Sequence, residues 1–150
     1  MRLLIQRVTQ ASVSVQNEII SNIGMGMLVF VGFEDLDNDE DISWGCHKLA
    51  NLRIFEDENH IPNLSLLDIN GDLLLVSQFT LHAATKKGNR PSYIRASNGE
   101  TALILYKKMI EQIEQLLNKK ISTGSFGVEM KVNLINDGPH TIWIDSKNKE

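Results

Sequence analysis

The chain has 150 residues, of which 42% are hydrophobic and 23% charged, and 15 Lys and Arg against 19 Asp and Glu give a formal net charge of −4. This length suits one folded domain, and the composition excludes a disordered tail, a collagen-like chain and a disulfide scaffold. Proteins that coat nucleic acid are usually basic, whereas this chain is acidic. If it binds a nucleic acid, it must do so through a local patch or by holding one end of the nucleic acid. The single Cys46 excludes an internal disulfide, argues against a zinc cage and fits a reducing cytoplasm.

The first 33 residues predict three strands. Residues 3–15 alternate imperfectly and carry many β-branched side chains, which indicates a long strand that bends or bulges near Ala11. A hairpin turn at residues 16–18 leads to a short strand at 19–23. The continuous apolar run at residues 27–33 is typical of a strand buried on both faces. Polar residues interrupt the first apolar run too early for a signal peptide, and no apolar run is long enough for a membrane span.

The middle of the chain predicts one helix between loops and strands. In the acidic stretch 34–41, which we expect to be solvated, Asp37 and Glu40 resemble a capping box. The helix that follows would turn three apolar side chains inward, those of Ile42, Cys46 and Leu49. Next come a short strand, a loop and the most strand-like segment of the chain, at residues 52–55, 57–67 and 73–79.

The last part of the chain predicts an exposed basic loop at residues 82–93 and then a long helix. Ser97 and Glu100 resemble a second capping box, and apolar side chains at helical spacing continue to Leu117. The remaining segments are a strand at 121–123, a turn at 124–127, an alternating strand at 128–135, a break at 136–139, extended structure at 141–144 and a frayed tail at 145–150. The pattern predicts one α+β domain with a mostly antiparallel sheet and two main helices.

Common catalytic and cofactor signatures are absent. The sequence has no P-loop, no Gly-x-Ser-x-Gly elbow and no histidine pair at metal-ligand spacing, and Val29 stands where a dinucleotide fingerprint starting at Gly24 needs its third glycine. Cys46 and His47 are neighbours, so on a helix they point apart, and Cys46 is better interpreted as a core residue. We therefore expect no metal ion and no cofactor.

Two segments combine polar residues in less ordinary ways. In Val76-Ser77-Gln78-Phe79-Thr80-Leu81, polar side chains interleave with apolar ones at the end of a buried strand. Asn136-Asp137-Gly138-Pro139-His140-Thr141 is a polar segment around a Gly-Pro pair, which can hold a cis peptide bond. Each segment alone is also compatible with a plain strand end or a plain turn.

In this order and separation, the two hexapeptides resemble those of the D-aminoacyl-tRNA deacylase family. The resemblance covers nearly the whole chain through shorter matches at Leu4-Ile5-Gln6-Arg7-Val8, Ala11-Ser12-Val13, Arg53-Ile54-Phe55, Asn63-Leu64-Ser65, Arg90-Pro91-Ser92 and Gly124-Ser125-Phe126-Gly127 with Met130. His140 departs from the family pattern, in which a small apolar residue is expected, and His82 follows the first motif closely. Either histidine at a pocket mouth would make activity pH-sensitive.

The resemblance implies a barrel-like sheet and a homodimer that hydrolyses the ester between a D-amino acid and the 3′-terminal adenosine of tRNA. Ser77, Gln78, Phe79 and Thr80 would line the pocket for the adenosine and the aminoacyl group. Gly138-Pro139 would enter the partner subunit's pocket, with its backbone carbonyls excluding an L side chain, so glycyl-tRNA would also be a substrate. Arg7 would hold the Gly-Pro pair in place.

The chemistry expected of such a site depends mainly on positioning. Neither hexapeptide offers an obvious general base, but an aminoacyl ester is activated, and the ribose 2′-OH can assist its hydrolysis. Backbone N–H groups near Phe79 and Thr80 would stabilise the oxyanion. A covalent role for Thr80 is the alternative. The basic loop after the motif could contact the tRNA backbone or be merely solvated; its cations are Lys86, Lys87 and Arg90.

Two other functions stay open on the sequence alone. A non-catalytic module that binds aminoacyl-tRNA or RNA, related to synthetase editing domains, would share the pocket residues. A hydrolase of free D-amino-acid esters or peptides would not need tRNA. Turnover of D-aminoacyl-tRNA excludes the first function, and dependence on tRNA excludes the second. We expect a cytoplasmic protein with neither a membrane nor a DNA partner.

Overall fold

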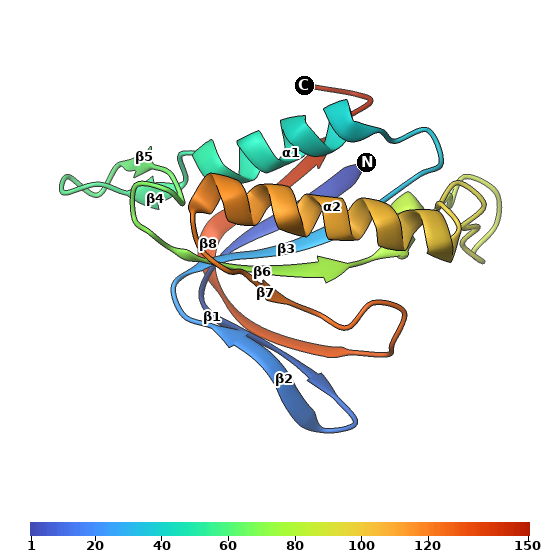
Figure 1. The fold of residues 1–150 in the computed structure, drawn as a ribbon, viewed down its shortest axis with the longest axis horizontal. Helices are drawn as coiled ribbons and strands as arrows, with labels where there is room; N and C mark the ends of the chain where they lie inside the picture. Colours follow the sequence, from blue (N-terminus) through green and yellow to red (C-terminus); the bar gives the residue numbers. More distant parts are fainter.

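The computed structural model describes residues 1–150 as two helices packed on a curved sheet (Figure 1). Helices α1 (Asp39–Asn51) and α2 (Gly99–Leu117) lie side by side over one half of the sheet. The predicted α+β class is confirmed. The strands are β1 (Arg2–Val15), β2 (Glu18–Ile23), β3 (Gly26–Gly32), β4 (Phe55–Glu56), β5 (Pro62–Leu64), β6 (Asp72–Ser77), β7 (Ser122–Thr123) and β8 (Lys131–Asp145).

Strand β1 is the central strand of the sheet and pairs with three others. Its residues 2–8 pair with β3 and its residues 11–15 with β2, while β8 pairs along the other edge. The ladder with β8 shifts register twice between Gln6 and Gln10, close to the bend predicted at Ala11. Because β1 changes partners at this bend, the sheet curls into a nearly closed, barrel-like half beyond the helices, as Figure 1 shows.

The sheet is mixed rather than uniformly antiparallel. All three ladders of β1 are antiparallel, whereas β3 pairs with β6, and β6 with β7, in parallel. Parallel neighbours need long crossover connections. Helix α1 and the β4–β5 hairpin occupy the first crossover, and α2 occupies the second, which is why both helices cover the same half of the sheet.

Two hydrophobic cores follow from this curvature. The larger one lies between the helices and the sheet and includes the fully buried Leu3, Ile5 and Met109. Cys46 belongs to it, as predicted, and burial raises the pKa of its thiol to about 12, so it is a packing residue. The smaller core fills the curled half, where its buried members are Val8, Ala11, Val13, Ile23, Leu28, Leu74 and Val76.

Both helix caps lie one residue beyond their predicted positions. The side chain of Asn38, not Asp37, accepts the N–H of Asp41, and the Asp41 carboxylate accepts the N–H of Asn38 in return. Asp37 is instead buried against the N-terminal ammonium. Asn98, not Ser97, caps α2. The acidic stretch is therefore partly buried, contrary to the prediction that it is solvated.

Three strand predictions need correction. The strand predicted at 52–55 begins only at Phe55, as β4, and the loop predicted at 57–67 contains β5, which pairs with β4 alone. Strand β6 ends at Ser77 rather than Phe79, because Gln78 leaves the extended conformation and a 3-10 turn, η1 (Phe79–His82), follows. Val128 was expected within the strand after the turn, but it precedes β8 and is exposed.

Strand β8 continues through the break predicted at residues 136–139. Pairing with β1 passes from Gln6–Thr141 to Val8–Asn136, so residues 137–140 bulge opposite Arg7 while the strand resumes on both sides. The tail is also better anchored than predicted. Ser146 is buried against the N-terminal ammonium, and Lys147 forms an ion pair with Asp41.

Candidate active site

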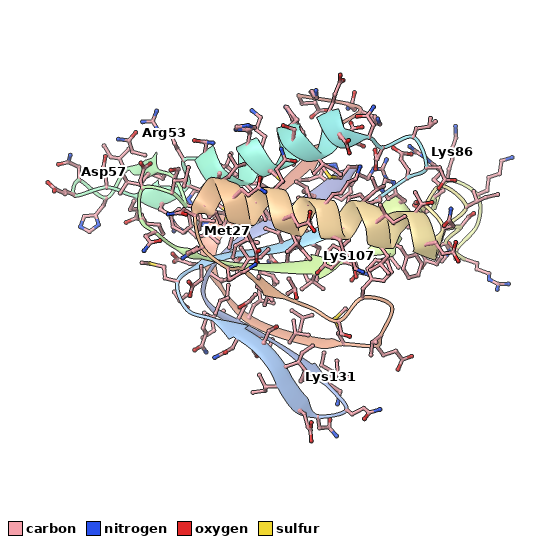
Figure 2. All side chains as sticks on the ribbon, in the orientation of Figure 1. Met27, Arg53, Asp57, Lys86, Lys107 and Lys131 are labelled. Carbon is pink, nitrogen blue, oxygen red and sulfur yellow. The ribbon has the colours of Figure 1, made fainter.

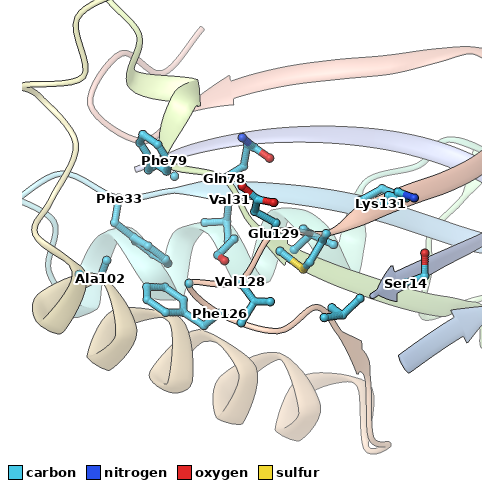
Figure 3. Close-up of a pocket in the computed structure, with 18 of the residues that line it drawn as sticks. Ser14, Val31, Phe33, Gln78, Phe79, Ala102, Phe126, Val128, Glu129 and Lys131 are labelled. Carbon is cyan, nitrogen blue, oxygen red and sulfur yellow. The ribbon is translucent and has the colours of Figure 1, made fainter. Parts of the chain in front are cut away.

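A large cavity opens where β6 ends (Figure 3). Its volume is about 1150 Å³. Five parts of the chain form its walls: the β1–β2 turn, the end of β3, the end of β6, the start of α2, and residues 126–132. No group of three or more His, Cys, Asp and Glu side chains is placed to hold a metal ion. No helix of the chain is both long and apolar enough to cross a bilayer.

The first motif supplies the end of β6 and the turn that follows it. Ser77, Gln78 and Phe79 line the cavity, and the Gln78 N–H donates to Val31 O across 2.7 Å, which ties the turn to β3. The Phe79 ring is 56% exposed and meets Tyr93 edge-on, with ring centroids 5.2 Å apart. An exposed aromatic pair at a cavity edge offers a stacking surface for a planar ligand.

Thr80 does not line the cavity. Its Oγ1 accepts a hydrogen bond from Gln78 Nε2 and bonds to no His, Asp or Glu side chain. The turn presents backbone donors instead. Phe79 and Thr80 are its first two residues, so their N–H groups have no acceptor within the turn. This arrangement suits an oxyanion hole better than a side-chain nucleophile.

The second motif is held by Arg7, which is buried on β1. Its Nε donates to Asp137 O at 3.1 Å and lies 2.9 Å from Asp137 Oδ2, and its Nη2 donates to Gly138 O at 3.3 Å. On the other side, Nη1 donates to Ile54 O at 2.6 Å, and Glu56 Oε1 lies 3.8 Å from Nη2. Arg7 therefore holds the backbone of the β8 bulge at Asp137 and Gly138.

The structure does not bring the two motifs together within one chain. The Gly138–Pro139 peptide bond is cis, and both residues are exposed. Neither residue lines the cavity beside Phe79. Any contact between Gly138–Pro139 and that cavity needs a second copy of the chain.

Neither His82 nor His140 lies at the mouth of the cavity. His82 is fully buried, its two ring nitrogens have no hydrogen-bond partner, and it does not line the cavity. Burial lowers the pKa of His82, and the backbone of Gly32 and the carboxylate of Glu34 only partly oppose this. His140 is half-buried in the β8 bulge and is also outside the cavity wall.

The basic loop follows η1 directly and returns at Tyr93 to pack on Phe79. Its three cations are exposed and form no ion pairs; they are Lys86, which Figure 2 labels, Lys87 and Arg90. The loop closes through paired backbone bonds between Ala84 and Ser92. Unpaired cations beside an exposed aromatic pair are suited to a nucleic-acid backbone.

Sequence reasoning missed most of the cavity wall. Phe33, Ala102 and Lys131 line it but come from three distant segments, and no local pattern marks them. Phe126 and Met130 also line it. These two did carry a signal, since they belong to a short segment shared with the family, but the sequence assigned them no role.

Comparison with known proteins points to one family. The family model described as D-Tyr-tRNA(Tyr) deacylase matches residues 4–145. The chain belongs to this deacylase family. It is 59% identical to the D-aminoacyl-tRNA deacylase of Flavobacterium psychrophilum and 53% identical to that of Bacteroides thetaiotaomicron, in both cases over 100% of the two chains.

Two solved structures share the deacylase-family fold of this chain. One, described as c-Myc DNA Unwinding Element Binding Protein, has a TM-score of 0.92 at 39% identity and covers 97% of this chain and 98% of its own. The other, described as a probable eukaryotic D-amino acid tRNA deacylase, has a TM-score of 0.82 at 19% identity and covers 95% of this chain and 98% of its own. The second likeness bears on the fold alone.

Proposed function

We propose that this enzyme of the deacylase family hydrolyses the ester bond of D-aminoacyl-tRNA and releases the D-amino acid and tRNA. One observation carries the proposal: the Ser-Gln-Phe-Thr segment ends β6 at a cavity whose wall includes three aromatic rings, and the first N–H groups of the turn that follows have no acceptor within that turn, in a chain that matches the family over residues 4–145. Glycyl-tRNA is a second substrate, because glycine has no side chain to exclude. The enzyme acts in the cytoplasm, where charged tRNA is used.

The reaction adds water to the ester carbonyl and breaks the bond between that carbon and the ribose 3′-oxygen, which leaves with a proton. The N–H groups of Phe79 and Thr80 stabilise the negative charge on the carbonyl oxygen. The neighbouring ribose 2′-OH assists the proton transfer. The absence of any carboxylate or imidazole bonded to the motif's hydroxyls supports this route over nucleophilic attack by Thr80.

Chiral selection comes from the second motif. Gly138–Pro139 of one subunit enters the cavity of the other in a homodimer, and its carbonyls occupy the space that an L side chain would need. Two observations support this assignment: the pair is exposed and absent from its own chain's cavity, and a buried arginine orients its backbone. A filter made of backbone is blind to side-chain identity, so many D-amino acids are accepted. Lys86, Lys87 and Arg90 contact the tRNA backbone.

The deciding experiment measures hydrolysis of D-Tyr-tRNA, L-Tyr-tRNA and Gly-tRNA by the purified protein. We expect turnover of the D and glycyl substrates and protection of the L substrate. A D-Tyr-tRNA whose terminal adenosine lacks the 2′-OH should react poorly. Binding without turnover would instead support an RNA-binding module, and equal turnover of a free D-tyrosine ester would support a simple esterase.

A further inference from the structure

The cavity at the end of β6 has two ends that differ in chemistry (Figure 3). Phe33, Phe79 and Phe126 lie toward one end, and Ser14 and Lys131 lie toward the other, where the polar β1–β2 turn completes the wall. The volume of about 1150 Å³ exceeds the roughly 300–1,000 Å³ usual for a pocket that holds one small ligand. The polar end therefore has room for a part of the ligand beyond a single nucleoside.

Only two charged residues face this cavity, Glu129 and Lys131. Lys131 forms no ion pair; its Nζ donates to Asn17 Oδ1 at 2.9 Å and keeps two further N–H groups free. The amide nitrogen of Asn17 is also free to donate, because its oxygen accepts from Lys131. Figure 3 shows Glu129 near Gln78 and Lys131 toward the far end.

These charges give an anionic group one favourable position. Glu129 repels an anion from the middle of the cavity, while Lys131 attracts it to the polar end. A nucleoside at the aromatic end of the cavity, if it is the last nucleotide of an RNA, carries one phosphodiester on its 5′ side. The distribution of charge along the cavity wall thus matches that of an RNA 3′ end.

We propose that Lys131 binds the phosphodiester on the 5′ side of the terminal adenosine, with Asn17 as a second donor. This inference rests on the proposed function and adds a subsite to it. Phosphate contacts by lysine position a nucleic acid without reading its sequence. The subsite would therefore set how deeply the tRNA end enters the cavity, and with it the place of the ester beside the Phe79 turn.

The test uses two non-hydrolysable ligands that share a D-tyrosyl group joined to adenosine through a 3′-amide. One ends at the free 5′-OH, and the other carries a 5′-methyl phosphodiester. We expect the wild-type protein to bind the phosphodiester ligand about three- to tenfold more tightly at low salt, with an advantage that shrinks as salt rises. Lys131→Gln should abolish this advantage yet bind the uncharged ligand normally, and Lys131→Arg should keep it.

Lys107→Gln is the matched control, because Lys107 is exposed on α2, does not line the cavity and carries the same charge (Figure 2). It should retain the full advantage of the phosphodiester. A Lys131→Gln protein that keeps the advantage would overturn the subsite. An equal loss for both ligands would also overturn it, since Lys131 would then only shape the cavity through Asn17. If the wild-type protein binds neither ligand, the proposed function itself fails.

Discussion

The chain holds its two motifs in different ways. The side chains of Ser77–Thr80 are organised locally, since the Gln78 side chain donates to Thr80 two residues away, while one backbone bond from Gln78 to Val31 ties the segment to the neighbouring strand β3. Gly138–Pro139 is organised from a distance, since Arg7 reaches Gly138 across 131 residues of sequence. Arg7 itself is held by the β4–β5 hairpin through Glu56.

Because of this difference, substitutions in the two motifs should have different effects on the protein. A change in the first motif can alter the cavity and leave the fold intact, because its side chains are partly exposed and make few long-range contacts. A change in the support of the second motif affects the fold and the motif together, because the supporting group is a buried charge. Three substitutions test this contrast, and a fourth tests the buried His82 that follows the first motif.

Arg7→Ala should have the largest effect. It removes a guanidinium whose side chain is 5% exposed and leaves Asp137 and Glu56 without their partner. We expect the free energy of unfolding to fall by about 3–5 kcal/mol, with loss of D over L selectivity. Urea unfolding and the ratio of D- to L-Tyr-tRNA hydrolysis check this.

Arg53→Ala is the control, because that exposed arginine bonds only to Asn63 O. Unchanged stability and selectivity in Arg7→Ala would show that Gly138 does not depend on this contact.

Gly138→Ala should separate activity from stability. The nearest atom to an added Cβ is Asn136 Nδ2 at 3.5 Å, an ordinary contact, so the free energy of unfolding should change by less than about 1 kcal/mol. In the proposed dimer, however, the methyl group would enter the space beside the substrate, and hydrolysis of D-Tyr-tRNA should fall on the order of 100-fold. Gly24→Ala, whose Cβ has no neighbour closer than 3.8 Å, should change neither quantity. Wild-type hydrolysis by Gly138→Ala would place the chiral filter elsewhere.

Thr80→Ala should have a modest effect on rate. Its hydroxyl accepts a hydrogen bond from Gln78 and lies outside the cavity wall. We expect single-turnover hydrolysis of D-Tyr-tRNA within about tenfold of wild type, whereas removal of a true nucleophile costs on the order of a millionfold. A dead Thr80→Ala enzyme that still acts on the 2′-deoxy substrate would instead identify Thr80 as the nucleophile.

His82 should produce the smallest effect, a pH dependence of stability. Burial lowers the pKa of His82 from its ordinary 6.5, Arg2 and the N-terminal ammonium lower it further, and Gly32 and Glu34 oppose them. The folded state therefore favours the neutral ring, so its contribution is complete above pH 6.5 and is lost progressively as the pH falls towards the lowered pKa. Melting temperatures at pH 7.5 and 5.5 should diverge less in His82→Leu than in wild type. An unchanged difference would mean that another group governs this range.

Local sequence determined the regular elements and the composition of the first motif. Alternation with many β-branched residues predicted β1, apolar strand-like runs predicted β3 and β6, and a strong helical repeat predicted α2, each within a few residues of its observed bounds. The helix caps were misplaced by one residue because Asp37 and Ser97 cap helices as readily as their neighbours Asn38 and Asn98 do. Only the folded chain places the N-terminal ammonium against Asp37 and thereby leaves Asn38 to cap α1.

The tertiary structure decided what long-range contacts control. Local sequence treats Gly138–Pro139 as a break, but pairing with β1 on both sides carries β8 through it. His82 follows a polar motif and was expected at the surface, yet the packing of η1 against β3 buries it completely. The cavity wall joins five segments, and one of them contains Lys131, whose neighbours in sequence do not show what it faces. Sequence alone therefore determined which residues can form strands, helices and turns, while the closing of the sheet decided which of them share a cavity, because only that closure sets distances between residues far apart in the chain.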